Sequence, residues 1–398
     1  MSEEKGVIIV GAGLGGIRVA ENLRSGGYTG PITLIGDEIH PPYDRPPLSK
    51  SVLLGKDDRV DLKPAEFFAE STIALRTGQP VVSVSPAERT VALGSGDDAQ
   101  TLEYDSLVIA TGLRPRTFPG APAEGVHVIR TVDDALALRA ESEFASNAVV
   151  IGAGFIGCEA AASLRTRGLA VTLVEPAPTP LAAALGAKIG DLVTRLHVAN
   201  GVDVRSGVGV DAIVAHGDRV SAVRLSDGVE VPADLVVVGI GSTPVVEFLD
   251  GSGIELAARE NGGGIACDEV GHTVVDDVYA VGDVANWRNP SGVPVRVEHW
   301  NHTVEQAAIV AGQILGNDAD VAPAVPYFWS DQYDVKVQVL GWPRATDDVH
   351  IVDDDGKKFV AYFSRDGVLT AVAGGGKAGA VMKMRAKLLN STPIAELL

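Results

Sequence analysis

The sequence is poor in cysteine, in positive charge and in long apolar runs. It has two cysteines in 398 residues, and Cys158 and Cys267 lie too far apart in sequence to form a CxxC pair. This scarcity argues against a disulfide-stapled secreted module and predicts a reducing, cytoplasmic setting. No apolar run reaches 18 residues, so no membrane span is expected. Lysine and arginine total 33 against 52 acidic residues, and the formal charge of −19 argues against a nucleic-acid partner.

Glycine, by contrast, is abundant, and two glycine-rich fingerprints stand out. Residues 11–16 (GAGLGG) follow the apolar run 7–10, and residues 152–157 (GAGFIG) follow the apolar run 149–151. Each predicts a strand, a tight turn and a helix whose first N–H groups can bind a pyrophosphate. One match can be an ordinary turn, but two in matching contexts predict two dinucleotides and electron transfer between them. The residues predicted to form the cradles are Gly11, Gly13, Leu14, Gly15, Gly16, Gly152, Gly154, Ile156 and Gly157.

An acidic residue follows the second predicted strand of each unit. Glu175 comes directly after the strand at 170–174, where its carboxylate can accept hydrogen bonds from both ribose hydroxyls and repel a 2′-phosphate. Residues 176–179 contain no arginine or lysine to receive that phosphate, so this site is predicted to prefer NADH over NADPH. In the first unit the matching position is Gly36, and the next residue, Asp37, is the predicted ribose contact.

The order of apolar runs and turn signals predicts an α/β protein. We expect two Rossmann-like dinucleotide-binding domains and a C-terminal α+β domain, because aromatic and β-branched runs begin after about residue 320. Predicted parallel strands are 7–10, 32–35, 107–110, 148–151, 170–174, 235–238 and 278–281, and predicted helices are 14–25, 155–167 and 301–315. The expected domains are 1–113 with 240–320, then 114–239, then 321–398.

Five short segments outside the fingerprints carry a family resemblance. They are 42–50 (PYDRPPLSK), 110–112 (ATG), 281–285 (VGDVA), 298–301 (EHWN) and 327–332 (YFWSDQ). With the fingerprints, they make the chain resemble the FAD-dependent pyridine-nucleotide oxidoreductases over nearly its whole length. More narrowly, it resembles the NADH-dependent ferredoxin reductases that serve bacterial cytochromes P450 and Rieske-type oxygenases. The resemblance implies that the first domain binds FAD and the second binds NADH.

The resemblance also implies a set of cofactor contacts. Asp283 would hold the ribityl chain of FAD, and Trp300 would begin a helix whose N-terminus faces the flavin pyrimidine edge and stabilises its negative charge. Val82 would meet the adenine through its backbone. The remaining implied contacts are Ala110, Thr111 and Gly112 beside FAD, Arg45 and Arg130 at the pyrophosphate or flavin, and Gly241 at the domain crossing.

Each of these contacts has an alternative interpretation from the residue alone. Asp283 can cap a helix that begins at Val284. Arg45 can be a surface ion-pair residue, and Trp300 and Trp329 can be ordinary core aromatics. Residues 239–241 can be only a crossing between domains.

The resemblance assigns the hydride-transfer step to three side chains. Lys50 would sit beside flavin N5, Glu159 would pair with Lys50 and contact the nicotinamide amide, and Trp329 would wall the nicotinamide site. The alternative interpretations are a surface lysine and a solvated helix carboxylate. Thr179 and Ala183 stand where family members often carry arginines, which weakens any preference for NADPH.

The electron acceptor is inferred from a missing thiol. No cysteine lies between Asp37 and Lys50, where disulfide reductases and related peroxidases carry theirs. Without a thiol relay, the resemblance implies direct transfer to a [2Fe-2S] ferredoxin. From Gly356 onward the sequence has seven basic and two acidic residues, a net charge of +5. This charge can steer an acidic ferredoxin toward the protein. The alternative is that these are ordinary scattered lysines.

Two other functions remain open at this point. One is a reductase of rubredoxin or another small acceptor. The other is a redox-sensing flavoprotein resembling apoptosis-inducing factor, although the chain lacks a basic excess or a long insertion that would support it.

Overall fold

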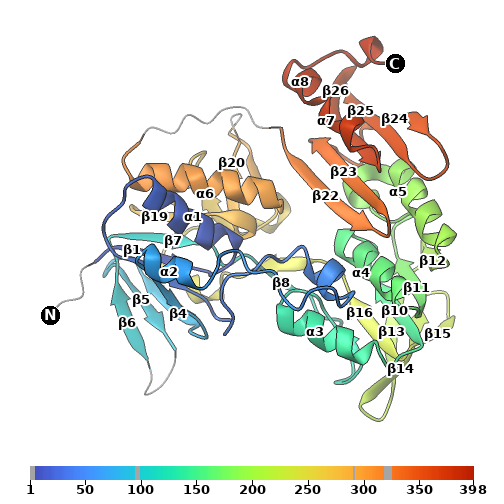
Figure 1. The fold of residues 1–398 in the computed structure, drawn as a ribbon, viewed down its shortest axis with the longest axis horizontal. Helices are drawn as coiled ribbons and strands as arrows, with labels where there is room; N and C mark the ends of the chain where they lie inside the picture. Colours follow the sequence, from blue (N-terminus) through green and yellow to red (C-terminus); the bar gives the residue numbers. More distant parts are fainter. Residues whose placement is uncertain (1–4, 95–98, 290–291, 318–324) are drawn as a thin grey trace. The chain divides into compact units, whose positions relative to one another are not determined.

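The computed structural model describes residues 5–94, 99–289, 292–317 and 325–398. Contacts divide the chain into two units, each described here by itself (Figure 1). Unit 1 comprises the described residues of Met1–Asp44, Val60–Arg114 and Thr243–Ala322, and unit 2 those of Arg45–Arg59, Pro115–Ser242 and Pro323–Leu398. The expected domain boundaries remain a prediction, and the one expected at 320/321 lies outside the described residues.

Unit 1 is built on a five-stranded parallel sheet. Its strand order is β19-β7-β1-β2-β3, and the strands are Val278–Ala280, Ser106–Ile109, Val7–Val10, Ile32–Ile35 and Ile73–Arg76. Helices α1 (Leu14–Ser25) and α6 (Trp300–Ile314) pack side by side (Figure 1). All four residues of β1 are buried, as expected for a central parallel strand that is covered on both faces.

Shorter elements complete unit 1. One antiparallel sheet contains β4 (Val81–Ser85), β5 (Thr90–Leu93) and β6 (Gln100–Glu103). A second small sheet contains β18 (Ile265–Cys267), β20 (Ala285–Arg288) and β21 (Pro294–Arg296). The short helices are α2 (Glu66–Glu70), η3 (Glu247–Leu249), η4 (Arg259–Asn261) and η5 (Gly282–Val284). Strands β8 (Leu113–Pro115) and β17 (Ser242–Pro244) lie where the chain passes between the units.

Unit 2 repeats the parallel sheet with the order β12-β11-β10-β16-β9. Its strands are Asp203–Ser206, Ala170–Glu175, Asn147–Ile151, Leu235–Val238 and Val126–His127. Its helices are α3 (Val132–Glu141), α4 (Phe155–Thr166), α5 (Ala182–Ala199) and the π-helix η1 (Leu48–Val52), which contacts α3 and α4. A three-stranded sheet follows, formed by β13 (Val210–His216), β14 (Arg219–Leu225) and β15 (Glu230–Pro232).

The C-terminal part of unit 2 is an antiparallel sheet with the order β22-β23-β26-β25-β24. The strands are Tyr327–Gln332, Val335–Gly341, Val368–Gly375, Phe359–Arg365 and Asp348–Asp354. They are followed by α7 (Ala378–Met382), α8 (Arg385–Leu389) and η6 (Ile394–Glu396). Strand β22 packs on α4, where Phe328 meets Phe155 edge to face. The predicted fold class, two Rossmann-like domains with a C-terminal α+β domain, is confirmed.

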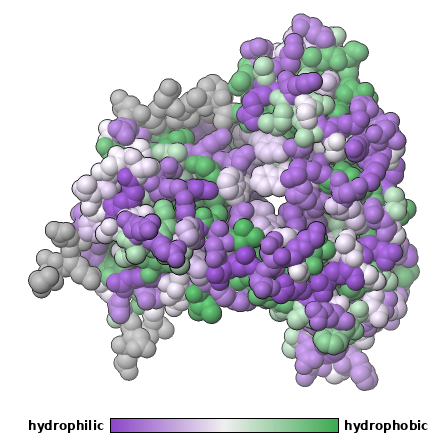
Figure 2. Space-filling model, in the orientation of Figure 1, coloured by the Kyte–Doolittle hydropathy of each residue, from purple (hydrophilic) through white to green (hydrophobic). Residues whose placement is uncertain are grey.

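The surface is largely hydrophilic on the face that Figure 2 shows. Hydrophilic residues cover much of the face drawn in Figure 2, and hydrophobic residues gather there in small groups. Within the described ranges, no helix has the length and apolar character needed to cross a membrane.

The first helix of unit 1 depends on a glycine at a close contact. A Cβ at Gly16 would lie 2.0 Å from the carbonyl oxygen of Gly11, whereas a Cβ at Gly312 on α6 would meet nothing within 4 Å. We expect Gly16→Ala to lower the free energy of unfolding by about 2 kcal/mol or more because backbone must shift. Gly312→Ala should be neutral or stabilise by about 0.5–1 kcal/mol. Urea unfolding of both variants measures this, and a Gly16→Ala protein as stable as wild type would contradict it.

Candidate functional site

The two glycine loops share one geometry. Gly11 (φ +112°) and Gly152 (φ +95°) adopt left-handed backbone conformations, and a Cβ at either would lie 2.3 Å from a carbonyl oxygen, that of Ala110 or Gly239. The last glycine of each loop is equally restricted, since a Cβ at Gly157 would lie 2.0 Å from the carbonyl oxygen of Gly152. These glycines are therefore required by the turn and by helix packing.

The middle glycine of each loop has a different reason to be there. A Cβ at Gly13 or Gly154 would meet no atom of the residues that the structure describes within 4 Å. These two residues precede α1 and α4 as N-caps, and no side chain in the described part of the protein caps the first N–H groups of either helix. Open space in front of uncapped N–H groups is what the close approach of a pyrophosphate needs. Both loops therefore fit a dinucleotide.

The neighbouring loop positions differ in what they face. Ile156 is half exposed in the first turn of α4, and Leu14 is partly buried at the start of α1. A Cβ at Gly15 would lie 3.2 Å from Val281 and 3.3 Å from Thr303, so this glycine allows α1 to approach α6. Contacts of these residues with a cofactor remain predictions.

The ends of the second strands match in register. Val10 pairs with Ile35 and Ile151 pairs with Val174, so Gly36 and Glu175 occupy equivalent positions. Glu175 accepts hydrogen bonds from the N–H groups of Ala153 (2.7 Å) and Ala177 (2.9 Å), which fixes its carboxylate beside the glycine loop.

The equivalent position in unit 1 carries no carboxylate. Gly36 is buried, and a Cβ there would lie 2.8 Å from the Cβ of Ala12. Asp37, the next residue, is exposed, and its ribose contact remains a prediction.

Hydrogen bonds within unit 1 fix the turn that carries Asp283, after the carboxyl end of β19, and the side chain of Trp300. The Gly282 N–H donates to Gln306 (2.8 Å), Arg296 donates to the carbonyl oxygen of Asp283 (3.0 Å), and the Trp300 indole N–H donates to Asp44 (2.9 Å). The interpretation of Asp283 as a helix cap is wrong, because the single turn of η5 leads directly into strand β20. Trp300 is half-buried at the first position of α6, one residue before the predicted helix start, rather than enclosed in the core.

Two further segments of unit 1 were predicted to border FAD. Thr111 donates its hydroxyl to the carbonyl oxygen of Val245 (2.8 Å), and the Val245 N–H donates to Gly112 (3.0 Å), which fixes this turn. The preceding residue, Ala110, donates to Val10 (2.7 Å). Val82 is 44% exposed and lies at a register irregularity of β4, where its backbone is not part of the regular pairing.

In unit 2 the structure brings Arg45 and Arg130 together. The Arg45 guanidinium donates to the backbone carbonyl of Arg130, and the Arg130 N–H donates to Asp134 (3.1 Å) at the start of α3. Gly241 has φ +95° and accepts from the N–H of Arg116 (2.9 Å).

Trp329 lies partly buried on β22. It stacks on Tyr327 with 5.9 Å between ring centroids, and the ammonium of Lys336 lies 5.6 Å from its ring. It is therefore not an ordinary core aromatic, and its predicted place at the nicotinamide remains a prediction.

The strongest cluster of unit 2 is an ion pair between Lys50 and Glu159. Lys50 Nζ lies 2.7 Å from Glu159 Oε2, and the two side chains are only 17% and 5% exposed. Ser49 donates to the same oxygen (2.6 Å), and Ser330 donates to Oε1 (2.7 Å). The interpretations as a surface lysine and a solvated helix carboxylate are therefore wrong. A buried carboxylate with three donors stays fixed in position and has about one acceptor site left.

Sequence reasoning missed Ser49 and Ser330. Both lie within the quoted segments 42–50 and 327–332, next to the candidates Lys50 and Trp329. A single serine has no spacing or charge that marks it, so the signal was present only in its neighbours.

Neither cysteine is suited to a redox role. Cys158 and Cys267 are free thiols buried in the protein. Burial raises the pKa of both thiols well above its usual range, which suppresses the reactive thiolate.

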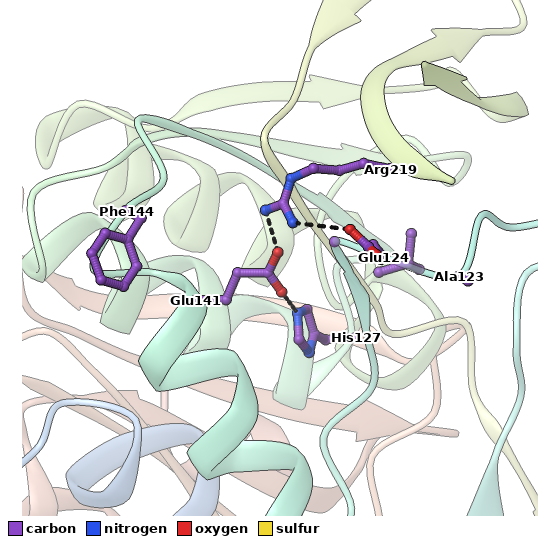
Figure 3. A pocket seen from close by; sticks show the side chains of 8 residues that line it. Ala123, Glu124, His127, Glu141, Phe144 and Arg219 are labelled. Carbon is purple, nitrogen blue, oxygen red and sulfur yellow. Dashed lines mark hydrogen bonds and ion pairs between the residues drawn. The ribbon is translucent and has the colours of Figure 1, made fainter. Parts of the chain in front are cut away.

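An open hollow of about 570 Å³ lies elsewhere on unit 2 (Figure 3). Arg219 bridges Glu124 and Glu141 there, and Glu141 meets His127 (2.5 Å). Glu141 ends α3 and so lies near the amino ends of the parallel strands, whereas dinucleotides bind at the carboxyl ends. The hollow is lined by Ala123, Glu124, Gly125, Val126, His127, Glu141, Phe144 and Arg219.

Comparison with known proteins agrees with this geometry. Residues 5–307 match the family described as pyridine nucleotide-disulphide oxidoreductase, and residues 327–396 match the reductase C-terminal family. The chain therefore belongs to the pyridine nucleotide-disulphide oxidoreductase family, and the predicted resemblance is confirmed.

The individual relatives are named as reductases of rhodocoxin or ferredoxin. Rhodocoxin reductase of Rhodococcus erythropolis is 40% identical over 87% of this chain and 80% of its own. A ferredoxin–NAD(P)+ reductase of Sphingomonas sp. is 37% identical over 92% of this chain and 88% of its own. The crystal structure of the ferredoxin reductase for the CYP199A2 system from Rhodopseudomonas palustris is 36% identical, with a TM-score of 0.91 over 98% of this chain and 96% of that one.

A buried histidine behind the Glu159 cluster makes stability depend on pH. Burial lowers the pKa of His197 to about 4, below the value of about 6.5 expected in the unfolded chain. The unfolded chain therefore binds more protons between those values, and stability is lost as the pH falls through this window. We expect His197 to account for about 1 kcal/mol of the loss between pH 7.5 and 5.5.

Urea unfolding of His197→Gln at the two pH values measures this contribution. The variant should lose less stability on acidification than wild type, while His216→Gln, at an exposed position, should behave like wild type. His299 and His302, whose pKa values burial also lowers to about 4, should contribute to the loss of stability that remains in this variant. An unchanged slope in His197→Gln would contradict the assignment.

Proposed function

We propose that this chain is an FAD-containing NADH:ferredoxin reductase that supplies single electrons to a [2Fe-2S] ferredoxin of a cytochrome P450 or Rieske-type oxygenase. The observation that carries the proposal is the pair of glycine loops, each with an open middle glycine before an uncapped helix. Two dinucleotide cradles in one chain suit an enzyme that takes a hydride from one cofactor onto another. We place this function in the cytoplasm, in line with two free cysteines.

Unit 1 is the proposed FAD unit. Its loop at 11–16 would receive the pyrophosphate, and the exposed bulge at Val82 leaves backbone available for the adenine. Asp283 would bind the ribityl hydroxyls from a turn that Gln306 and Arg296 hold in place. Bound FAD accepts electron pairs and releases single electrons, which the side chains of this protein cannot do.

Unit 2 is the proposed NADH unit. The Glu175 carboxylate is fixed beside the loop at 152–157 by two backbone N–H groups, where it can accept from the ribose hydroxyls. A 2′-phosphate would meet this negative charge. Thr179 is only 7% exposed, so it offers that phosphate little contact, and Ala183 has no polar side chain. We therefore propose a preference for NADH over NADPH.

Lys50 and Glu159 are the proposed catalytic residues. Glu159 would accept a hydrogen bond from the nicotinamide amide through its remaining acceptor site and so hold the ring for hydride transfer. Lys50, paired with Glu159, would stabilise negative charge on the reduced flavin. Trp329 would cover the nicotinamide.

The proposed acceptor follows from the thiols and from the relatives. The sequence between Asp37 and Lys50 has no cysteine, and the thiols of Cys158 and Cys267 are buried. Electrons therefore have no dithiol to reduce and must leave to an external carrier. Relatives whose names include ferredoxin reductase support a ferredoxin in this role.

Anaerobic titration with NADH tests the proposed function. The purified protein should be yellow and should be bleached by one equivalent of NADH, and NADPH should do so far more slowly. Lys50→Ala and Glu159→Gln should slow bleaching by about 10- to 100-fold with FAD still bound, because each breaks the buried pair. The matched control is the exposed pair Arg224–Glu230, where Arg224→Ala and Glu230→Gln should leave the rate unchanged.

The same experiment separates the open alternatives. A flavin that stays oxidised with excess NADH would contradict the proposal. Fast reduction followed by transfer to rubredoxin but not to any [2Fe-2S] ferredoxin would favour the small-acceptor reductase. Slow turnover with every acceptor and a long-lived charge-transfer band would favour the redox sensor.

The proposed docking surface uses only some of the seven basic residues that follow Gly356. Three of the seven pair with carboxylates: Lys357 with Asp334, Lys377 with Asp353, and Arg365 with Asp347. The other four form no ion pair within the described residues: Lys358 is exposed before β25, and Lys383, Arg385 and Lys387 are exposed together at the end of α7 and on α8. We propose that these last three residues attract the acidic ferredoxin.

A charge-reversal experiment tests this surface. Lys383→Glu combined with Lys387→Glu should raise the KM for ferredoxin roughly tenfold at low ionic strength, and the difference should shrink at high salt through screening. Ferricyanide reduction should be unchanged. The control Arg205→Glu with Arg224→Glu makes the same change in net charge at exposed positions of unit 2 and should leave the KM near wild type. Equal effects in the two double variants would argue against a local docking surface.

A further inference from the structure

From Glu159, a line of side chains joined by hydrogen bonds runs into the C-terminal sheet. Ser330 Oγ lies 2.7 Å from Glu159 Oε1, Gln332 Nε2 lies 3.2 Å from Ser330 Oγ, and His197 Nε2 lies 3.1 Å from Gln332 Oε1. The hydroxyl of Tyr333 lies 3.0 Å from His197 Nδ1. Ser330, Gln332 and His197 have no exposed surface, so no water competes for these hydrogen bonds.

The chemistry of the groups sets the direction of every bond in this line. An ionised Glu159 can only accept, so the Ser330 hydroxyl must donate to it. Ser330 then accepts from the Gln332 amide, whose oxygen accepts from the Nε2–H of His197. A neutral His197 with its hydrogen on Nε2 accepts from Tyr333 at Nδ1. Four donors in sequence therefore point toward one carboxylate, an arrangement in which neighbouring bonds strengthen one another.

The last member of the line is held in a strained backbone conformation. Tyr333 begins the two-residue connection between β22 and β23 and has φ +57°, a region where bulky residues are rare. Such strain persists only where the surroundings stabilise it. Here the Tyr333 side chain reaches His197 by both a hydrogen bond and an edge-to-face ring contact.

The hydrogen bonds of this line also determine which Glu159 oxygen can accept one more hydrogen bond. Oε2 of Glu159 already accepts from Ser49 and Lys50, while among the described residues Ser330 is the one donor to Oε1. A carboxylate oxygen has two acceptor positions, so Oε1 retains one. We propose that Ser330 is a positioning residue for hydride transfer, which, through Gln332 and His197, orients Glu159 so that this remaining position meets the nicotinamide amide. The inference rests on the proposed binding of NADH to unit 2.

Ser330→Ala is the direct test. We expect a roughly tenfold weaker affinity for NAD+ in calorimetry and a limiting rate of flavin reduction lowered by a similar factor, with FAD content unchanged. Ser330→Thr retains the hydroxyl and should restore both values to within about threefold of wild type. Gln332→Leu, which leaves Ser330 in place but removes its donor, should show a smaller loss in the same two values.

A matched control is available in the same sheet. Ser364 is also buried, on β25, and bonds to a histidine, His350, at 2.9 Å, so Ser364→Ala measures the cost of deleting a buried hydroxyl as such. The inference is overturned if Ser330→Ala matches wild type or Ser364→Ala, or if the threonine variant fails to restore activity while remaining folded. Should Ser330→Ala not fold, a wild-type affinity in Gln332→Leu overturns it equally. Wild-type protein that neither binds NAD+ nor is reduced by NADH would instead refute the proposed function.

Discussion

The buried ion pair between Lys50 and Glu159 is the interaction on which unit 2 depends. It joins three segments that are far apart in sequence, because Lys50 comes from η1, Glu159 from α4, and the supporting Ser330 from β22. Removing one partner of a buried pair leaves an uncompensated charge at a cost of about 3–5 kcal/mol. The pair and its serine thereby link both the segment 45–59 and the C-terminal sheet to α4, the helix that follows the second glycine loop.

The two nucleotide folds use the same backbone solution but different chemistry at equivalent positions. Both loops need glycine at their first and last positions because a side chain would collide with a carbonyl oxygen. They diverge one residue after the matched strand pairs, where unit 2 has Glu175 and unit 1 has Gly36. Unit 2 thus has a fixed carboxylate beside its loop, whereas the equivalent residue of unit 1 is a glycine and the next residue, Asp37, is exposed.

Much of this organisation could be predicted from local sequence. Strand and helix positions around both fingerprints were predicted because apolar runs and glycine spacing are local properties. The Lys50–Glu159 pairing was also predicted, but from family resemblance rather than from spacing. Ser49, Ser330, Gln332 and His197 were not predicted, since their partners lie 110 to 171 residues away, except for the bond between Ser330 and Gln332, which are two residues apart.

The sequence by itself determined the two glycine fingerprints in their strand–helix contexts and the absence of cysteine between Asp37 and Lys50, because turns, strand–helix alternation and missing cysteines are visible residue by residue. Only the tertiary structure decided which charges are available. It buried Lys50 and Glu159, paired Lys357, Lys377 and Arg365 with carboxylates, and left Lys383, Arg385 and Lys387 exposed. The physical reason is that the strength and reach of a charge depend on the groups and solvent around it, and these groups come from distant parts of the chain.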